Sequence, residues 1–258
     1  MDKELLEFNK TMEQLEKGEI RVAEKINGKW VVNTWVKEII LSGFRLGKLT
    51  EMSSGMFSFF DKDTFPPRRF KIEDRVRIVP GGSMVRRGAY LASSVVMMPP
   101  SYVNVGAWIG EGSMIDSNVI VGSCAQVGKN VHLGANVQIG GVLEPVGALP
   151  VIIEDDAFIG GGSGIYEGTV VSRGAVIAAG VSITRSAALY DAVNDTYISP
   201  SEEGQLIVPE NAVVVSGSRP LRRYNCKNEG IQIYTPVIVK YRNEKTKASV
   251  ALEETLRL

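Results

Sequence analysis

An aliphatic residue or a methionine recurs at every sixth position through the middle of this chain. We call these the core positions, and they are Leu91, Met97, Val103, Ile109, Ile115, Val121, Val127, Leu133, Ile139, Ile153, Ile159, Ile165, Val171, Ile177, Ile183 and Leu189. A period of six matches neither the turn of an α-helix nor the simple alternation of a strand. It is typical of a parallel β-helix, in which three short faces close one triangular coil.

The repeat therefore predicts a three-sided prism of about five or six coils, roughly 25 Å tall at the usual strand spacing. Glycine often follows the core position, as at Gly110 and Gly122. We expect these glycines at the corners, where the chain turns with positive φ or with little side-chain bulk. The period is interrupted between Ile139 and Ile153, so residues 141–150 are predicted to leave the prism as an excursion loop.

The pattern divides the chain into three parts and predicts a mainly β protein. Residues 1–80 are predicted as a small α/β domain, residues 81–220 as the β-helix, and residues 221–258 as a C-terminal extension of a strand and a helix. The expected elements are helices at 3–17, 34–44 and 249–256, a hairpin of strands 21–25 and 29–32 around Asn27-Gly28, a strand at 233–240, and loops at 53–69, 141–150 and 190–205. Val208 and Val214 predict a final partial coil.

The charge balance and the cysteine content narrow the function. Lysine plus arginine equals aspartate plus glutamate, 29 each, so nothing favours a nucleic acid or a membrane surface as partner. No apolar run is long enough to span a bilayer. The two cysteines, Cys124 and Cys226, form no CxxC pair, and the chain has one histidine. We therefore expect a reduced cytoplasmic protein without a metal site.

Several short motifs resemble those of the tetrahydrodipicolinate N-succinyltransferases, a family of hexapeptide-repeat transferases. The motifs are Arg21-Val-Ala-Glu-Lys25 before Trp30, Pro100-Ser-Tyr-Val-Asn104, Gly122-Ser-Cys-Ala-Gln126, Gly128-Lys-Asn-Val-His132, Ile139-Gly-Gly-Val-Leu-Glu-Pro145 and Pro236-Val-Ile-Val-Lys240. The hexapeptide pattern alone indicates an acyltransferase. The first and fifth motifs together are much more specific, and the similarity extends over nearly the whole chain.

The resemblance implies a left-handed coil and a defined reaction. The succinyl group of succinyl-CoA would pass to the amine of L-2-amino-6-oxopimelate, the ring-opened form of tetrahydrodipicolinate, in lysine and diaminopimelate biosynthesis. It also implies a cytoplasmic homotrimer that uses succinyl-CoA as co-substrate and holds no permanently bound cofactor. Two alternatives stay open here, a tetrahydrodipicolinate N-acetyltransferase that uses acetyl-CoA and a non-catalytic β-helix scaffold.

Asp116 is the first candidate catalytic residue. It follows a core position where glycine is usual, and the resemblance places the family's acid there; a carboxylate can hold the attacking amine and accept its proton. The second acid is open. Relatives carry a glutamate at the position of Gly164, so either Glu167 or Tyr166 replaces it, or Asp116 works alone.

The substrate-binding candidates are Arg77, Asp116 and Gly141. By the resemblance Arg77 binds a substrate carboxylate as a bidentate partner, with Arg86 and Arg87 as alternatives. The backbone N–H of Gly141 would bind the thioester carbonyl or a substrate oxygen.

The remaining candidates are weaker. Lys240 and Arg242 belong to a basic cluster that could contact the phosphates of CoA, although a solvated face is the simpler interpretation for most of that cluster. His132 is interpreted as a strand residue and Cys124 as small core packing, in preference to a catalytic base and a nucleophile.

Overall fold

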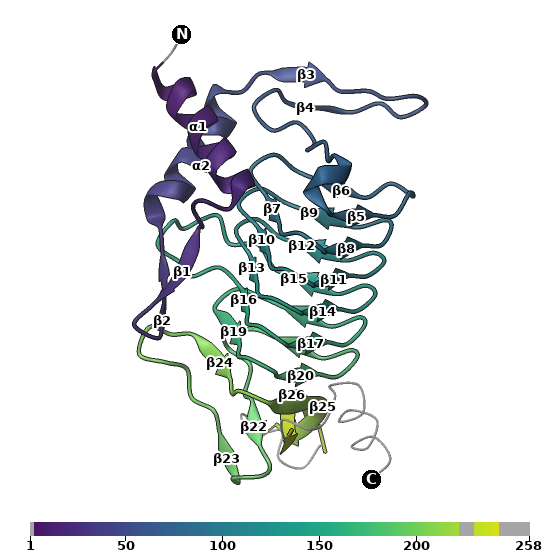
Figure 1. The fold of residues 1–258 in the computed structure, drawn as a ribbon. Helices are drawn as coiled ribbons and strands as arrows, with labels where there is room; N and C mark the ends of the chain where they lie inside the picture. The colour runs from purple at the N-terminus through teal and green to yellow at the C-terminus, as the bar shows by residue number, and fades with distance from the viewer. Residues whose placement is uncertain (1–2, 222–229, 243–258) are drawn as a thin grey trace.

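The structure is a computed structural model that describes residues 3–221 and 230–242. Its centre is a three-sided prism of short parallel strands, which we number sheet I, sheet II and sheet III (Figure 1). Sheet I contains β7 (Tyr90–Leu91), β10 (Trp108–Ile109), β13 (Gln126–Val127), β16 (Ile152–Ile153), β19 (Thr169–Val171) and β24 (Leu206–Val208). Sheet III contains β6 (Met84–Val85), β9 (Tyr102–Val103), β12 (Ile120–Val121), β15 (Gln138–Ile139), β18 (Gly164–Ile165) and β21 (Ser182–Ile183).

Sheet II is the longest of the three. Its parallel strands are β5 (Arg77–Ile78), β8 (Val96–Met97), β11 (Met114–Ile115), β14 (His132–Leu133), β17 (Phe158–Ile159), β20 (Val176–Ile177) and β25 (Ala212–Pro220). β26 (Gln232–Tyr241) then pairs with β25 in antiparallel fashion and with β22 (Tyr190–Asp191), which forms a hairpin with β23 (Thr196–Tyr197). The predicted final coil and C-terminal strand are confirmed, while the predicted helix at 249–256 lies outside the described residues.

All sixteen core positions are buried inside the prism, with side chains at most 6% exposed. Successive coils stack the same position, so that Ile109 pairs with Val127 and Val127 with Ile153. The interior of the repeat is therefore an aliphatic ladder, as its period predicts.

The glycines that follow core positions lie at the corners because little side-chain bulk is tolerated there, one of the two reasons expected, and they do not supply the positive φ. Positive φ falls two residues later in most corners, at residues such as Asn118 (60°), Asn130 (53°) and Gly168 (71°). Glycine is needed directly after the core position because coils approach closely there. A Cβ on Gly110 would lie 2.4 Å from the carbonyl oxygen of Gly128 in the next coil.

The N-terminal domain lies along the outer face of sheet I (Figure 1). It contains α1 (Lys3–Lys17), the hairpin of β1 (Ala23–Ile26) and β2 (Lys29–Val32), and α2 (Thr34–Leu46), which runs two residues beyond the predicted 34–44 and is capped by Gly47. Asn27 and Gly28 both have positive φ in the hairpin turn, as their sequence indicates.

Three segments differ from their sequence interpretation. The prism begins at β5, a few residues before the boundary expected at 80/81. The segment 53–69, expected as a loop, contains β4 (Phe60–Lys62), which pairs with β3 (Leu49–Glu51) and precedes a 3₁₀ turn at Ile72–Asp74. The expected loop 190–205 contains the β22–β23 hairpin. Each strand is too short to produce a hydrophobic period of its own.

Candidate active site

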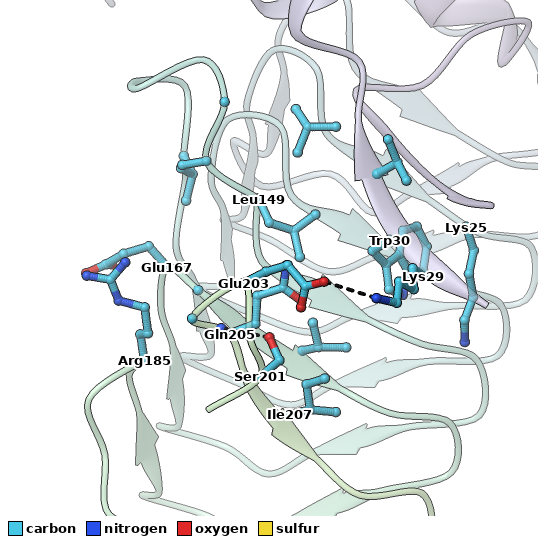
Figure 2. Close-up of a pocket in the computed structure, with 18 of the residues that line it drawn as sticks. Lys25, Lys29, Trp30, Leu149, Glu167, Arg185, Ser201, Glu203, Gln205 and Ile207 are labelled. Carbon is cyan, nitrogen blue, oxygen red and sulfur yellow. Dashed lines mark hydrogen bonds and ion pairs between the residues drawn. The ribbon is translucent and has the colours of Figure 1, made fainter. Parts of the chain in front are cut away.

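A cavity of about 1250 Å³ opens on the outer face of sheet I, beside the corner between sheets III and I. Three segments far apart in sequence form its walls, namely the β1–β2 hairpin, the excursion loop and the segment 201–207 (Figure 2). Gly141 and Glu167, both predicted from sequence, line it. Asp116, Arg77 and Arg242 are not among its lining residues.

Arg21 fixes the N-terminal domain to the prism. Its guanidinium carbon lies 4.2 Å from the ring centre of Trp108, and its Nε donates to the side-chain oxygen of Gln126 at 3.0 Å. Trp108 and Gln126 are outward-facing residues of neighbouring strands in sheet I. Burial lowers the pKa of Arg21 to about 10, which leaves it charged at neutral pH.

Glu154 holds the hairpin against the cavity. Its Oε1 accepts hydrogen bonds from Lys25 Nζ at 2.7 Å and from Trp30 Nε1 at 2.8 Å, and its Oε2 accepts one from the backbone N–H of Arg173 at 3.1 Å. Burial alone would raise the pKa of Glu154, but these hydrogen bonds and the charge of Lys25 lower it overall. The Arg-Val-Ala-Glu-Lys motif and Trp30 therefore act by docking the hairpin on sheet I.

Gly141 begins the excursion loop at the closest contact between coils. A Cβ on Gly122 would lie 2.2 Å from the backbone nitrogen of Gly141, and a Cβ on Gly141 would lie 2.6 Å from the nitrogen of Ser123. Neither position can hold a larger residue without moving backbone. The contact directs the loop from the corner toward the cavity.

Glu167 and Tyr166 lie one coil beyond the start of this loop. Glu167 lines the cavity beside Arg185 (Figure 2). Tyr166 instead folds back over sheet III, where its hydroxyl donates to Gln138 at 3.0 Å. A Cβ on Gly164 would lie 2.5 Å from that hydroxyl oxygen, so the tyrosine ring covers Gly164. Only Glu167 of this pair reaches the cavity.

Asp116 lies at a different corner of the prism. It follows β11 of sheet II and precedes β12 of sheet III, and its Oδ1 accepts a hydrogen bond from the N–H of Ser117 at 2.7 Å. Arg77 is exposed on the outer face of sheet II, two strands away from β11, a distance of about 10 Å. Within one chain, Asp116 and Arg77 therefore lie along sheet II and its corner with sheet III, whereas Gly141 and Glu167 lie at the corner between sheets III and I.

The alternative arginines are used within the fold. Arg86 pairs with Asp61 and lies over the rings of Phe44 and Phe65. Arg87 donates to the carbonyl of Thr64 and to Asn9. Arg77 is the exposed member of the three candidates.

Two further sequence candidates lie on the last coil. Arg242 donates to the carbonyl of Gly174 at 3.1 Å, and Lys240 lies opposite Val213 on β26. The sequence suggested both as CoA contacts, and the structure places them at the C-terminal end of the prism.

His132 and Cys124 have the structural positions that the sequence indicates. The His132 ring packs against that of Phe158 on the outer face of sheet II, with the two ring planes tilted by 48°. Cys124 is fully buried, packs against the N-terminal helices, and has its pKa raised to about 12 by that burial, so its thiol is neutral. Among residues 3–221 and 230–242, no group of His, Cys, Asp or Glu is placed to hold a metal ion, and no helix there could cross a membrane.

Sequence reasoning missed Lys29, Arg185 and Glu203, which line the cavity. Lys29 Nζ and Glu203 Oε1 form an ion pair at 3.2 Å across its mouth (Figure 2). The period contains no signal for them, because they lie on the hairpin, on a corner and in the segment 201–207.

Three family models match the chain. One described as tetrahydrodipicolinate N-succinyltransferase N-terminal matches residues 3–46, a bacterial transferase hexapeptide model matches 106–141, and a hexapeptide repeat of succinyl-transferase matches 150–185. A solved structure of a 2,3,4,5-tetrahydropyridine-2-carboxylate N-succinyltransferase from Campylobacter jejuni has the same fold, with a TM-score of 0.54, 17% identity, and coverage of 90% of this chain and 62% of that one. The chain is thus a left-handed parallel β-helix of the hexapeptide transferase class.

Curated relatives narrow the class further. The 2,3,4,5-tetrahydropyridine-2,6-dicarboxylate N-succinyltransferase of Idiomarina loihiensis is 45% identical over 251 residues, and that of Paraburkholderia phymatum is 44% identical over 254 residues. Each alignment covers 95% of this chain and 86% of the relative. This chain belongs to the tetrahydrodipicolinate N-succinyltransferase family.

Proposed function

We propose that the catalytic centre of this enzyme forms between two copies of the chain. The enzyme is a CoA-dependent N-acyltransferase that passes the succinyl group of succinyl-CoA to the amine of L-2-amino-6-oxopimelate in lysine and diaminopimelate biosynthesis. The observation that carries our proposal is the separation of Asp116 and Arg77 from Gly141 and Glu167, which lie at different corners of one prism. A neighbouring copy can bring the two groups together.

The charge of the cavity supports a second contributor. Six glutamates but only two lysines and one arginine line it, namely Glu144, Glu154, Glu167, Glu202, Glu203, Glu210, Lys25, Lys29 and Arg185. A substrate with two carboxylates and a CoA with several phosphates both need an excess of cations. The exposed Arg77 of a neighbour would supply one of them.

We propose a homotrimer, because two faces of each prism are open to neighbours. The N-terminal domain lies mainly against sheet I and reaches sheet III only at its first coils, where Asp61 pairs with Arg86. The outer positions of sheet III include Met84, Tyr102 and Ile120, and Ile120 is 49% exposed in the single chain. The outer ladder of sheet II includes Met114 and Phe158. Apolar ladders on two faces suit a closed ring of three copies.

In the proposed reaction, the substrate ammonium first loses one proton to solvent, and Asp116 then holds the free amine and accepts its second proton as the nitrogen attacks the thioester carbonyl. Arg77 binds a substrate carboxylate, and the N–H of Gly141 faces the developing oxyanion. The new C–N bond forms, the C–S bond breaks, and the CoA sulfur leaves with a proton from Glu167. Lys240 and Arg242 are our proposed contacts for the phosphates of CoA. The free, buried thiol of Cys124 supports a cytoplasmic location.

Mixed trimers test the shared site directly. Asp116→Asn and Glu167→Gln should each fold, assemble and lose about 10²–10⁴ of kcat with succinyl-CoA. If the two carboxylates come from different copies, random mixing of the two variants restores about a quarter of the sites, and activity recovers accordingly. Mixtures with no more activity than the separate variants would place both groups in one chain and overturn the proposal.

Turnover of the wild-type enzyme with acetyl-CoA, measured alongside, should be far slower than turnover with succinyl-CoA.

A further inference from the structure

Lys37 is a fully buried lysine on α2, outside the groups used above. Its Nζ donates to the backbone carbonyl of Ala148, in the excursion loop, at 2.7 Å. None of the ion pairs among residues 3–221 and 230–242 includes Lys37. An ammonium group is therefore buried without a carboxylate, in contact with a loop 111 residues away in sequence.

Stability does not explain this lysine. Burial lowers its pKa, which means that the site disfavours the charged form. Val36 and Ile40, its neighbours on α2, and Cys124 form an apolar core with the N-terminal helices. A methionine of similar length would fill the space without the cost of desolvating a charge.

The contact holds the part of the loop that forms the cavity wall. The loop starts with a hydrogen bond from the N–H of Val142 to the carbonyl of Ser123 at 3.1 Å. Further along, the N–H of Ala148 donates to the carbonyl of Pro145, and the Ala148 carbonyl accepts the hydrogen bond from Lys37 Nζ. Gly147, Ala148 and Leu149 then line the cavity, with Leu149 packed against the hairpin residues Trp30 and Val32.

We infer that Lys37 is a positioning residue for the succinyl transfer proposed above, on which this inference rests. Its ammonium fixes the Ala148 carbonyl, and so fixes the cavity wall of residues 147–149 relative to the N-terminal domain. A loop released from this contact moves its backbone N–H groups and Leu149 relative to the bound substrates. Displacements of about 1 Å at such a site cost on the order of a hundredfold in rate.

The test compares Lys37→Met with Lys62→Met. Lys62 is a matched control, because its Nζ also donates to a backbone carbonyl, that of Gly47 at 2.9 Å, but Gly47 is not among the residues that line the cavity, whereas Ala148 is. Lys37→Met should lower kcat/KM for succinyl-CoA by roughly 10- to 100-fold while its melting temperature stays unchanged or rises. Lys62→Met should keep wild-type kcat/KM, and Lys37→Arg, which retains a donor, should recover part of the loss.

Amide hydrogen exchange gives a readout that needs no activity. The N–H groups of Ala148 and Leu149 should exchange faster in Lys37→Met than in the wild type, while the amides of β15 and β16 stay protected. Unchanged kcat/KM, or a loss that follows a fall in melting temperature, would overturn the inference. If the wild type itself fails to use succinyl-CoA, the proposed function falls, and the exchange rates alone then decide whether Lys37 holds the loop.

Discussion

Ile152 and Ile120 occupy the same place in the six-residue repeat, one position before a core residue, but they have opposite surroundings. Ile152, on the outer face of sheet I, is fully buried, whereas Ile120, on the outer face of sheet III, is 49% exposed. The N-terminal hairpin accounts for the difference, since Ala23, Trp30 and Val32 pack with Ile152. The inside of the prism is uniform, and its outside is specified face by face.

The comparison shows how the domain is directed to one face. Sheet I presents Trp108, Gln126 and Glu154 to Arg21, Lys25 and Trp30. Hydrogen bonds and ion pairs are directional, and an apolar surface offers none. These contacts therefore dock the N-terminal domain on sheet I in preference to the other two sheets. The other two faces remain available for the neighbouring copies that we propose.

Replacing the exposed apolar side chain of Ile120 on sheet III by a charged one should have the largest effect. Ile120→Glu places a charge in the proposed contact between copies, and an unpaired charge there is costly to bury. We expect loss of the proposed trimer, measured by light scattering, and at least about a hundredfold loss of activity, because the proposed site is shared between copies. Leu6→Glu on α1 is the matched control, since Leu6 is 51% exposed. An Ile120→Glu protein that remains trimeric would show that sheet III is not an interface.

Adding a side chain at the close contact where the excursion loop starts should have the next largest effect. Gly122→Ala places a Cβ 2.2 Å from the backbone nitrogen of Gly141, and backbone cannot give way as a side chain can. We expect a loss of about 1–3 kcal/mol in the free energy of unfolding, measured with urea. Gly147→Ala in the same loop meets no atom within 4 Å and should cost little. Equal losses in both variants would contradict the close contact.

Removing the anchor on sheet I should have a smaller effect that depends on pH. The pKa of Glu154 is lowered from its usual 4.5, so its ionised form contributes stability above that pH, and this contribution is lost as the pH falls through the folded-state pKa. Glu154→Gln should therefore be less stable than the wild type by about 1–1.5 kcal/mol at pH 7. The difference should shrink as the pH falls below 4.5.

Thermal unfolding across pH 3–8 measures this dependence. Glu144→Gln, on an exposed carboxylate of the excursion loop, should match the wild type at pH 7. A Glu154→Gln curve parallel to the wild-type curve at every pH would mean that the carboxylate charge does not hold the hairpin.

The smallest effect is expected at the mouth of the cavity. Lys29 and Glu203 form an exposed ion pair, with side chains 74% and 50% accessible. Because exposed pairs are screened and cost side-chain entropy, Lys29→Ala should leave the melting temperature unchanged within error. A clear drop in melting temperature that salt abolishes would show that this pair closes the cavity.

Part of the candidate site was readable from the repeat. Asp116 stands out because glycine is usual at its place in the repeat, and the insertion before Ile153 marks the excursion loop. Glu167 was found only through the family resemblance. Counting the hexads in threes also assigns Asp116 to one corner and Glu167 to another. The cavity was not readable, because Lys29 and Glu203 belong to segments outside the period and meet only in three dimensions.

The sequence by itself determined the interior of this protein. A coil contacts only the coils above and below it, so the burial of each core position follows from a local rule that repeats every six residues. Tertiary structure decided the exterior, because contacts there join distant segments, as Lys25 and Glu154 do across 129 residues. That long-range docking decides which isoleucine is covered, which arginine stays free, and where the excursion loop forms the wall of a cavity.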